Sequence, residues 1–577
     1  MATIDPIVLE VLWNRLLAVV NEQQVALMRT AFSTVVRDSQ DLACGVFDGR
    51  GRMVAQSLTG TPGHINAMAT GVKHLLNKYP PATLEDGDVL LTNDPWLTSG
   101  QINDMTVVTP VFHKGRPVAY FASTCHAPDI GGRLFSGDAR EVYEEGLRIP
   151  ICKLMYAGKP NEMLLDIIRA NVRTPLETVG DLYAQMSSNV VGAESLIAFL
   201  TEFGMDDIEE LSDAIIDRSE QAMRDAIRAL PNGTWSTESW SDGYDEPIRI
   251  RATVTIRDED IDIDFAGSSP QSRWGINVVL NYTHAYASFA IKATLSPDVP
   301  HNHGAFLPVH VTAPEGSILN CQEPAAVASR HIIGHFLPGV IFGALGQVLP
   351  DRVIAGSADP IWISVWNGQP VDGAPFTFNV FQCGGMGARP MKDGLSATGF
   401  PSGVAGVPAE VIEASAPLIQ HRRELRPDSG GAGTYRGGLG QSTDVSRRFE
   451  GPCSLSALVD RIDHAAQGLR GGGPGSPGAY LLNRSTRPQA KSRIVIDPDD
   501  VVSLDPAGGA GYGDPFAREV ARVLDDVVNG YVSIEGAARD YGVDIDYTGA
   551  PDALVRLPSA YKVDADATHL LRSQPRR

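Results

Sequence analysis

The fold is constrained most by residues 93–132, which contain two apolar runs separated by a short turn sequence. The runs at 105–113 and 117–125 are rich in β-branched and aromatic residues, and Lys-Gly-Arg lies between them. This pattern predicts two antiparallel strands joined by a tight turn near Gly115. A chain that contains this hairpin has to build at least one antiparallel sheet.

The predicted hairpin brings a carboxylate and an imidazole side chain together. A turn centred near Gly115 places Asp104 opposite His126, with Cβ atoms roughly 4.5–5.5 Å apart. One interpretation is a structural hydrogen bond that closes the open end of the hairpin. The other is a metal site, favoured by Asp94 and Asp129, which lie in the flanking loops. Oxygen and nitrogen ligands without a thiolate pair suit Zn, Mn or a similar divalent ion.

Length and composition narrow the class of protein. A chain of 577 residues suggests roughly two to four domains. The formal charge of −21 and the lack of a Lys/Arg cluster argue against a nucleic-acid partner. No apolar run of about 18 residues and no signal peptide occur, so we expect no membrane association and a cytoplasmic location. Six scattered cysteines without a C-x-x-C pair fit reduced thiols.

The patterning along the chain predicts an α+β protein of several domains, with mixed or antiparallel sheets and packed helices. The expected segments are an α+β metal-site domain at 1–143, a helical segment at 144–232, a β-meander with helices at 233–353, a glycine-rich β-rich domain at 354–516, and helices with a loose tail at 517–577. The glycine-rich stretches contain no G-x-x-x-x-G-K-[ST] sequence. We therefore expect close-packed turns there and no nucleotide cradle.

Four further positions bear on the predicted site. Asp41 begins the first strand of a second hairpin, from which its side chain can lean toward Asp104 and His126. His64 opens a helix-like segment, where a histidine is usually a cap or a solvated residue. His331 and His335 have helical spacing, but the Glu of a zinc-protease motif is absent. A second metal at these histidines is therefore the weaker interpretation.

Several motifs together resemble those of the hydantoinase B/oxoprolinase family. This family contains the B-type subunits of ATP-dependent hydantoinases and lactamases, one half of 5-oxoprolinase and the large subunits of acetone-type carboxylases. The resemblance covers most of the chain and rests on NDPW, SGQINDM, KGRPVAYFAST and CHAPDIGG, and on the segments at 37–48, 144–150, 302–309, 313–320, 428–440 and 505–515.

The resemblance implies a set of site residues. The metal ligands would be Asp41, Gln101, Asp104 and His126. Gln101 departs from the family pattern, which has His-x-x-Asp where this chain has Gln-Ile-Asn-Asp. An amide is a weak ligand, so the metal is bound more loosely, or differs in identity, or the site is lost. The resemblance also implies that His64 lines the substrate pocket. We expect Asp129 to orient His126 or to act as general base.

The function implied is a division of labour between two subunits. A separate A-type, ATP-binding subunit phosphorylates the oxygen of a cyclic amide, such as a hydantoin, lactam or oxoproline-like ring. This chain then delivers metal-bound water to the activated carbon. Two alternatives stay open from the sequence: a subunit of an acetone- or acetophenone-type carboxylase, and a catalytically silent structural subunit.

Overall fold

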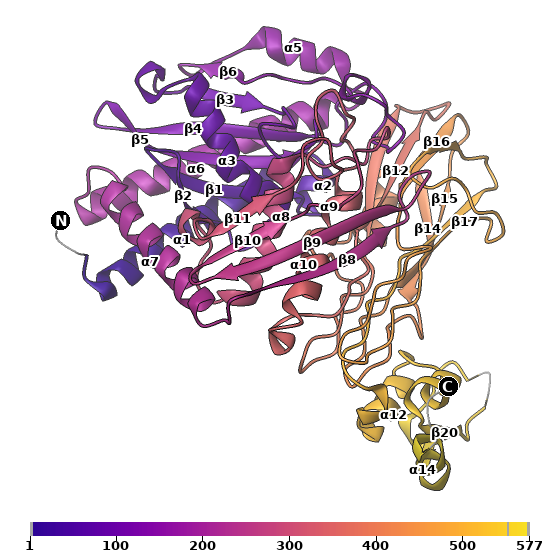
Figure 1. The fold of residues 1–577 in the computed structure, drawn as a ribbon. Coiled ribbons are helices and arrows are strands. Elements are labelled where there is room, and N and C mark those ends of the chain that lie inside the picture. The colour runs from indigo at the N-terminus through magenta and orange to yellow at the C-terminus, as the bar shows by residue number, and fades with distance from the viewer. Residues whose placement is uncertain (1–3, 551–552, 574–577) are drawn as a thin grey trace.

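The computed structural model describes residues 4–550 and 553–573 and confirms the predicted α+β class. The sheets are antiparallel except where β10 and β11 run parallel. Three large units pack together, and a small unit at the C-terminal end of the chain lies at the edge of the molecule (Figure 1).

The first unit is built on a seven-stranded antiparallel sheet with the order β2-β1-β5-β4-β3-β6-β7. Its strands are β1 (Leu42–Asp48), β2 (Met53–Gln56), β3 (Val89–Thr92), β4 (Asp104–His113), β5 (Arg116–His126), β6 (Cys152–Tyr156) and β7 (Lys159–Pro160). The predicted hairpin is β4–β5, at the centre of the sheet. Strands β6 and β7 come from the segment predicted to be helical. They form strands because β6 pairs with the free side of β3 and β7 pairs with β6.

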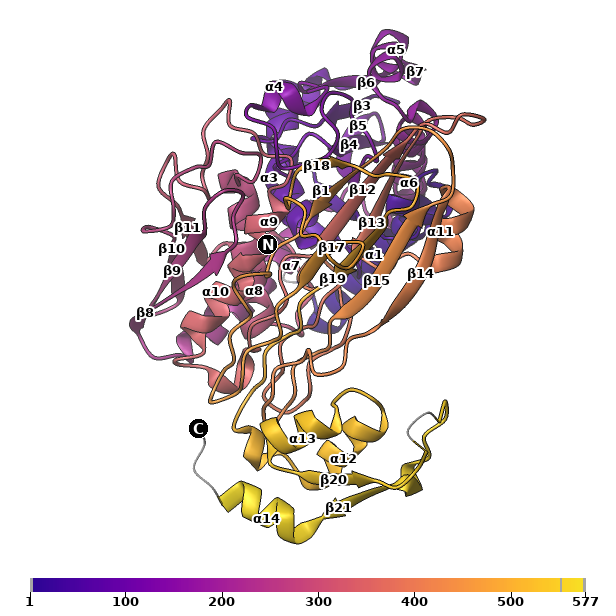
Figure 2. The same cartoon turned by 90° about the vertical axis from the view of Figure 1, so that its right-hand side faces the viewer.

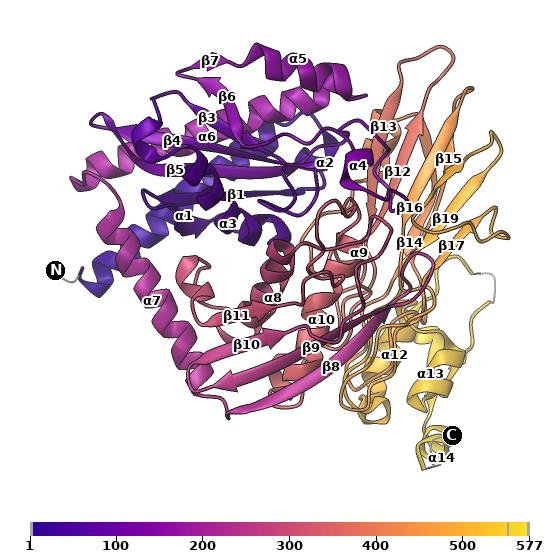
Figure 3. The same ribbon diagram turned by 45° about the horizontal axis from the view of Figure 1, so that its top comes forward.

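Helices cover both faces of this sheet. The helices of the segment before residue 230 are α1 (Pro6–Thr30), α2 (Thr34–Arg37), α3 (Pro62–Lys78), α4 (Val142–Glu145), α5 (Glu162–Asn171), α6 (Pro175–Phe203) and α7 (Glu209–Arg228). The long helices α1 and α6 share one apolar core with β1 and β5, and α3 packs on the opposite face. Helix α1 begins with a proline, and the Asp5 carboxylate accepts hydrogen bonds from the backbone of its first turn. Figure 3 shows α3 beneath the sheet, next to the second unit.

The second unit joins a four-stranded sheet to buried helices. The sheet contains the predicted meander, with β8 (Gly233–Ser241), β9 (Ile248–Arg257), β10 (Asp260–Asp264) and β11 (Val309–Thr312). Its inner face packs against α10 (Phe336–Leu345) and α8 (Leu280–Leu295), and α9 (His331–Gly334) precedes α10. Apolar side chains of both units belong to one continuous core, so α8 and α9 are held close to the first sheet.

The third unit is a sandwich of two four-stranded sheets, seen side by side in Figure 2. The first sheet contains β13 (Phe376–Gln382), β12 (Trp362–Gly368), β16 (Cys453–Leu458) and β18 (Arg493–Val495), and the second contains β14 (Leu418–Leu425), β15 (Gln441–Arg447), β19 (Val501–Asp505) and β17 (Ala479–Leu482). Helix α11 (Ala409–Ser415) packs beside β14. Below the sandwich, the glycine-rich segments run alongside one another, and backbone groups such as Gly438 N–H and the Met386 carbonyl bond between segments.

The small C-terminal unit is more ordered than its composition predicted. Of the residues expected to form a loose tail, 561–564 pair with 544–547 and 565–573 form the final helix, beside a core of valine, alanine, isoleucine and tyrosine side chains. Its elements are α12 (Val520–Val528), α13 (Ile534–Tyr541), β20 (Asp544–Tyr547), β21 (Tyr561–Asp564) and α14 (Ala565–Ser573). None of the helices within residues 4–550 and 553–573 combines the length and the apolar character that a membrane span needs.

Candidate active site

The open end of the β4–β5 hairpin carries the predicted pair. Asp104 lies directly opposite His126, and the predicted register holds until a bulge near the turn. The two side chains meet, with His126 Nδ1 3.1 Å from Asp104 Oδ1. Each residue lies at the end of its strand, but both are buried because the other units cover these strand ends. The predicted pairing of Asp104 with His126 is therefore confirmed.

Asp41 and His64 reach the same place from neighbouring elements. Strand β1 pairs with β5, so the residue before β1 lies beside His126, whose N–H donates to the Asp41 carbonyl at 3.2 Å. Helix α3 begins with Thr61 as its cap, and Thr61 Oγ1 donates to the Asp41 carboxylate at 3.1 Å. In the first turn, His64 places Nε2 2.9 Å from Asp104 Oδ2 and Nδ1 3.6 Å from Asp41 Oδ1. His64 is thus part of the site, whereas a histidine at a helix start is more often a solvated residue.

Gln101 points its amide nitrogen into the cluster. Gln101 Nε2 lies 2.7 Å from Asp104 Oδ1 and 2.8 Å from His126 Nδ1. The opposite atom, Gln101 Oε1, is buried and has no hydrogen-bond partner among the described residues, and the same holds for His126 Nε2. The amide therefore acts here as a donor to Asp104.

Arg330 is the main contributor that the sequence reasoning missed. Its guanidinium Nη2 lies 2.5 Å from Asp104 Oδ2, and its Nε donates to the carbonyl of Ser99. The planar group also lies over the ring of Tyr282, 4.0 Å from the ring centroid, where a cation–π contact favours it. Arg330 is 226 residues from Asp104 in the chain, and no local pattern links the two.

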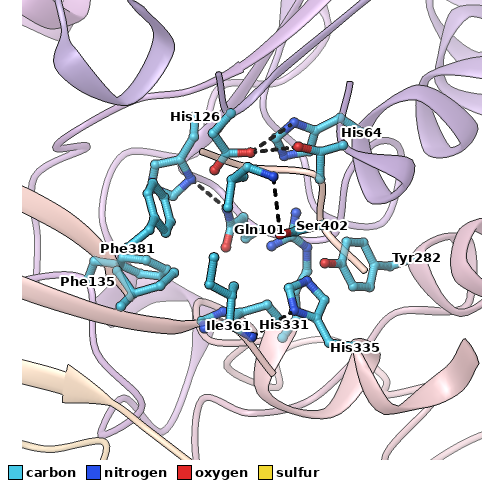
Figure 4. Close-up of a pocket in the computed structure, with 15 residues that line it drawn as sticks. His64, Gln101, His126, Phe135, Tyr282, His331, His335, Ile361, Phe381 and Ser402 are labelled. Carbon is cyan, nitrogen blue, oxygen red and sulfur yellow. Dashed lines mark hydrogen bonds and ion pairs between the residues drawn. The ribbon is translucent and has the colours of Figure 1, made fainter. Parts of the chain in front are cut away.

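Helix α9 and the residue that follows it add two histidines to the opposite wall. His331 and His335 face each other, with ring centroids 5.7 Å apart, and the ring of Phe135 lies between His331 and His126. In the view of Figure 4, His64 and His126 lie above the cavity, and His331 and His335 lie below it. The helical spacing of these two histidines was the one signal in the sequence that pointed to them.

Asp129 does not join this cluster. Its carboxylate is buried and pairs with Arg173, whose guanidinium Nη1 lies 2.7 Å from Asp129 Oδ1 and whose backbone N–H also donates to it. No hydrogen bond links Asp129 to His126, because the loop after β5 turns Asp129 toward the segment between α5 and α6. Asp94, the other carboxylate of the flanking loops, pairs with Arg148 at 2.6 Å.

The electrostatics of the cluster centre on Asp104. Burial alone would raise the pKa of Asp104, but the charges of His64 and Arg330 and hydrogen bonds from both histidines hold it well below its usual value. Burial alone would lower the pKa of His64, yet the neighbouring carboxylates Asp104 and Asp41 raise it. On the opposite wall, burial and Arg330 lower the pKa of His335 to about 3. The cluster therefore holds a charged half around Asp104 and a neutral half formed by the imidazoles of His331 and His335.

The cavity between the two halves is small. It measures about 30 Å³, which has room for roughly two water molecules. Its walls come from all three large units, and they include Tyr282, Ile361, Ile363, Phe381, Ser402 and Val404 besides the cluster. Buried nitrogen atoms without hydrogen-bond partners, among them His126 Nε2 and His331 Nε2, lie in residues that line it. Such atoms are the partners that a bound water needs.

The arrangement does not fit the metal that the resemblance implies. A divalent ion needs several deprotonated ligands with free lone pairs. Here four donors, from Gln101, His126, His64 and Arg330, surround the two oxygens of Asp104. Among the residues that the structure describes, no group of three His, Cys, Asp or Glu side chains has metal-binding geometry.

Comparison with known proteins gives the family. The family model for hydantoinase B/oxoprolinase matches residues 5–515. The putative B subunit of a D-/L-hydantoinase from a Pseudomonas species is 31% identical over 94% of this chain and 95% of its own length. The beta subunit of the caprolactamase of Pseudomonas jessenii is 31% identical over 96% of this chain and 98% of its own length. A crystal structure of ATP-dependent caprolactamase from that organism superposes with a TM-score of 0.88 at 29% identity, covering 99% of this chain and 100% of the other. The chain therefore belongs to the hydantoinase B/oxoprolinase family.

Proposed function

We propose that this chain is the B-type component of an ATP-dependent amidohydrolase that opens a cyclic amide such as a hydantoin or a lactam. The observation that carries the proposal is the end-to-end match to relatives named as the B component of a hydantoinase and the beta component of a caprolactamase. The buried cavity supports it, because histidine and carboxylate side chains surround space for water. Both relatives are named as one component of a larger enzyme, which supports an A-type, ATP-binding partner for this chain.

The proposed chemistry assigns one task to each partner. The A-type partner transfers a phosphoryl group from ATP to the amide oxygen and so makes the ring carbon electrophilic. A water in the cavity adds to that carbon, the ring C–N bond breaks, and the nitrogen takes a proton from the water, which leaves an acyl phosphate. A second water hydrolyses the acyl phosphate to the carboxylate and inorganic phosphate. The free nitrogens of His126 and His331 and the free Oε1 of Gln101 hold and orient this water. Asp104 holds His64 in place, and His64 in its charged form stabilises negative charge on the substrate.

Substrate entry requires the units to move apart. A five-membered ring is far larger than a cavity of about 30 Å³. Residues from the first sheet unit, from α9 and from β12 and β13 meet around the cavity (Figure 4). Pockets at such junctions commonly open by displacement of one unit against another. The proposal therefore includes an open state in which Ile361 and Phe381 separate from His64 and His126.

Reconstitution tests the proposal. The chain alone should neither hydrolyse ATP nor open hydantoins or lactams, and addition of its A-type partner should produce ATP-dependent ring opening. Asp104→Asn should lower that turnover by roughly 100-fold or more, because it removes the carboxylate that holds the histidines. Size-exclusion chromatography should show that the variant still binds the partner. Ring opening by the chain alone would contradict the two-component proposal, and a bicarbonate-dependent carboxylated product would favour the carboxylase alternative.

A second candidate, a catalytically silent structural role, is supported by one observation. The oxygens of Asp104 are surrounded by donors, and the family's ligand histidine is replaced by Gln101. In that case the assembled complex would open rings at a rate that Asp104→Asn leaves unchanged. The same assay therefore separates the two candidates.

A further inference from the structure

The positive charge beside Asp104 comes from the chain itself. The Arg330 guanidinium is 3% exposed at the side chain, and the Asp104 carboxylate that it contacts is fully buried. An arginine keeps its proton under all ordinary conditions, so this charge is permanent. A metal ion bound to the same carboxylate oxygen would lie within a few ångströms of it, and two cations at that distance repel strongly in a buried site.

The surroundings of Arg330 are built to hold a guanidinium. The Tyr282 ring supports its flat face, and the carbonyl of Ser99 accepts from Nε. The loop that carries Gln101 passes directly over the side chain at Gly100. A Cβ atom on Gly100, whose φ is +85°, would lie 2.8 Å from Arg330 Cδ, so only glycine lets the loop and the arginine pack this closely. The loop, the ring and the arginine thus fit one another without an added ion.

Gln101, like the Arg330 guanidinium, donates a hydrogen bond to the Asp104 carboxylate. An imidazole at this position could offer a lone pair to a metal, whereas the amide nitrogen of Gln101 offers hydrogens to Asp104 Oδ1. Together Gln101 and Arg330 cover both oxygens of the carboxylate, one from each side. Two positions far apart in the sequence therefore have the same effect, which is to satisfy Asp104 with donors.

We infer that Arg330 takes the place of the metal ion in this chain, and that with Gln101 it makes the site a metal-free variant of the family's site. The inference rests on the geometry around Asp104 and does not depend on the proposed function. If the chain proves to be silent in catalysis, the same replacement still holds. If it is active, the Arg330 guanidinium is the fixed cation of the site.

Metal content of the purified protein tests this inference directly. After incubation with equimolar Zn²⁺ or Mn²⁺ and desalting, elemental analysis should find less than a tenth of an equivalent in the wild-type protein. The double variant Gln101→His/Arg330→Met should retain close to one equivalent, a gain of about tenfold or more, because it restores an imidazole and frees Asp104. Adding Asp104→Asn to the double variant should abolish the gain.

A matched control is available at Asp129. Arg173→Gln also removes the arginine partner of a buried carboxylate, but no histidine lies beside it among the hydrogen bonds and ion pairs of Asp129. This variant should gain no metal. If it gains as much as the double variant, any unpaired buried carboxylate suffices and the special role of Arg330 is refuted.

Thermal unfolding gives a second measurement that does not depend on metal recovery. A ligand that binds only the folded state raises the melting temperature. Zn²⁺ or Mn²⁺ should therefore raise the melting temperature of the single variant Arg330→Met and leave that of the wild type unchanged. A wild-type protein that binds about one equivalent, and loses it in Asp104→Asn, would overturn the inference. A folded double variant as free of metal as the wild type would overturn it as well.

Discussion

At the residue scale, Glu145 shows how one buried carboxyl group makes stability depend on pH. Its Oε1 accepts hydrogen bonds from the backbone of Val327 and Ala328 at 2.6 and 2.7 Å, and its Oε2 has no partner in the described structure. Burial raises the pKa of Glu145 to about 8, although both backbone hydrogen bonds lower it. The folded protein therefore keeps this proton at neutral pH, where the unfolded chain has lost it.

The direction in which stability changes with pH follows from the difference in proton binding between the folded and unfolded states. Because the folded pKa of about 8 lies above the unfolded value of 4.5, the stabilising contribution is complete below pH 4.5 and is lost as the pH rises through 8. The full loss is on the order of 5 kcal/mol. Glu145→Gln keeps an acceptor for both N–H groups and cannot ionise.

We therefore expect Glu145→Gln to flatten the pH dependence of the free energy of unfolding and to exceed the wild type in stability at pH 9. Urea unfolding at several pH values between 5 and 9 measures this. The neighbouring variant Glu144→Gln removes a partly exposed carboxylate paired with Arg133, and it should leave the profile nearly unchanged. Parallel profiles for the wild type and Glu145→Gln would show that Glu145 is not the responsible group.

At the scale of elements, the glycine-rich segments are held by backbone contacts that side chains would prevent. A Cβ atom on Gly437 would lie 1.9 Å from the carbonyl oxygen of Gly509. Gly509 in turn donates to the Gly438 carbonyl at 2.9 Å, so neighbouring segments bond directly. Because glycine has no side chain, the backbones of these segments can lie in direct contact. The close packing predicted for the glycine-rich stretches is confirmed, as contact between backbones.

Gly437→Ala should lower the free energy of unfolding by about 1–3 kcal/mol or more, because the backbone of another segment has to move. Gly473→Ala is the matched control in the same bundle, since its nearest neighbours would lie 3.5 Å from the new Cβ. That variant should be neutral or slightly stabilising, because alanine restricts the unfolded chain. Equal losses in both variants would show that glycine flexibility, and not space, matters here.

At the scale of the whole molecule, a buried arginine ties the C-terminal unit to the glycine-rich segments. Arg518 is 1% exposed at the side chain, and its guanidinium contacts Asp393 at 2.7 Å and Asp526 of α12 at 2.7 Å. Asp393 belongs to a glycine-rich segment. The junction therefore contains a buried ion-pair network in which Arg518 joins two carboxylates and Arg436 also contacts Asp526, at 3.3 Å.

Arg518→Ala should lower the free energy of unfolding by about 3–5 kcal/mol, because Asp393 and Asp526 lose their closest cation and keep only Arg522 at 3.8 Å and Arg436 at 3.3 Å. The loss should be local, so limited proteolysis should cleave near residue 517 and release the C-terminal unit, which also tests the boundary predicted there. Arg539→Ala, which removes an exposed pair with Asp540, serves as the control and should leave the cleavage rate unchanged. Unfolding of the whole chain in a single step, without a protected core fragment, would contradict a separable unit.

The features that depend on residues close together in the sequence were the ones that could be predicted. The apolar runs and the turn at Gly115 determined the hairpin and the register that pairs Asp104 with His126, because strand alternation and turn length are local properties. The motifs determined the family and pointed to Asp41 and His64. The identity of Gln101 was enough to question the metal.

Only the tertiary structure decided what surrounds Asp104. Arg330 and Tyr282 come from a different unit, and a contact over more than 200 residues leaves no periodic signal in a single sequence. The turn of the loop after β5 likewise directs Asp129 toward Arg173 and away from His126. The sequence specifies which groups are present at the hairpin, whereas the packing of three units decides which charge meets the central carboxylate.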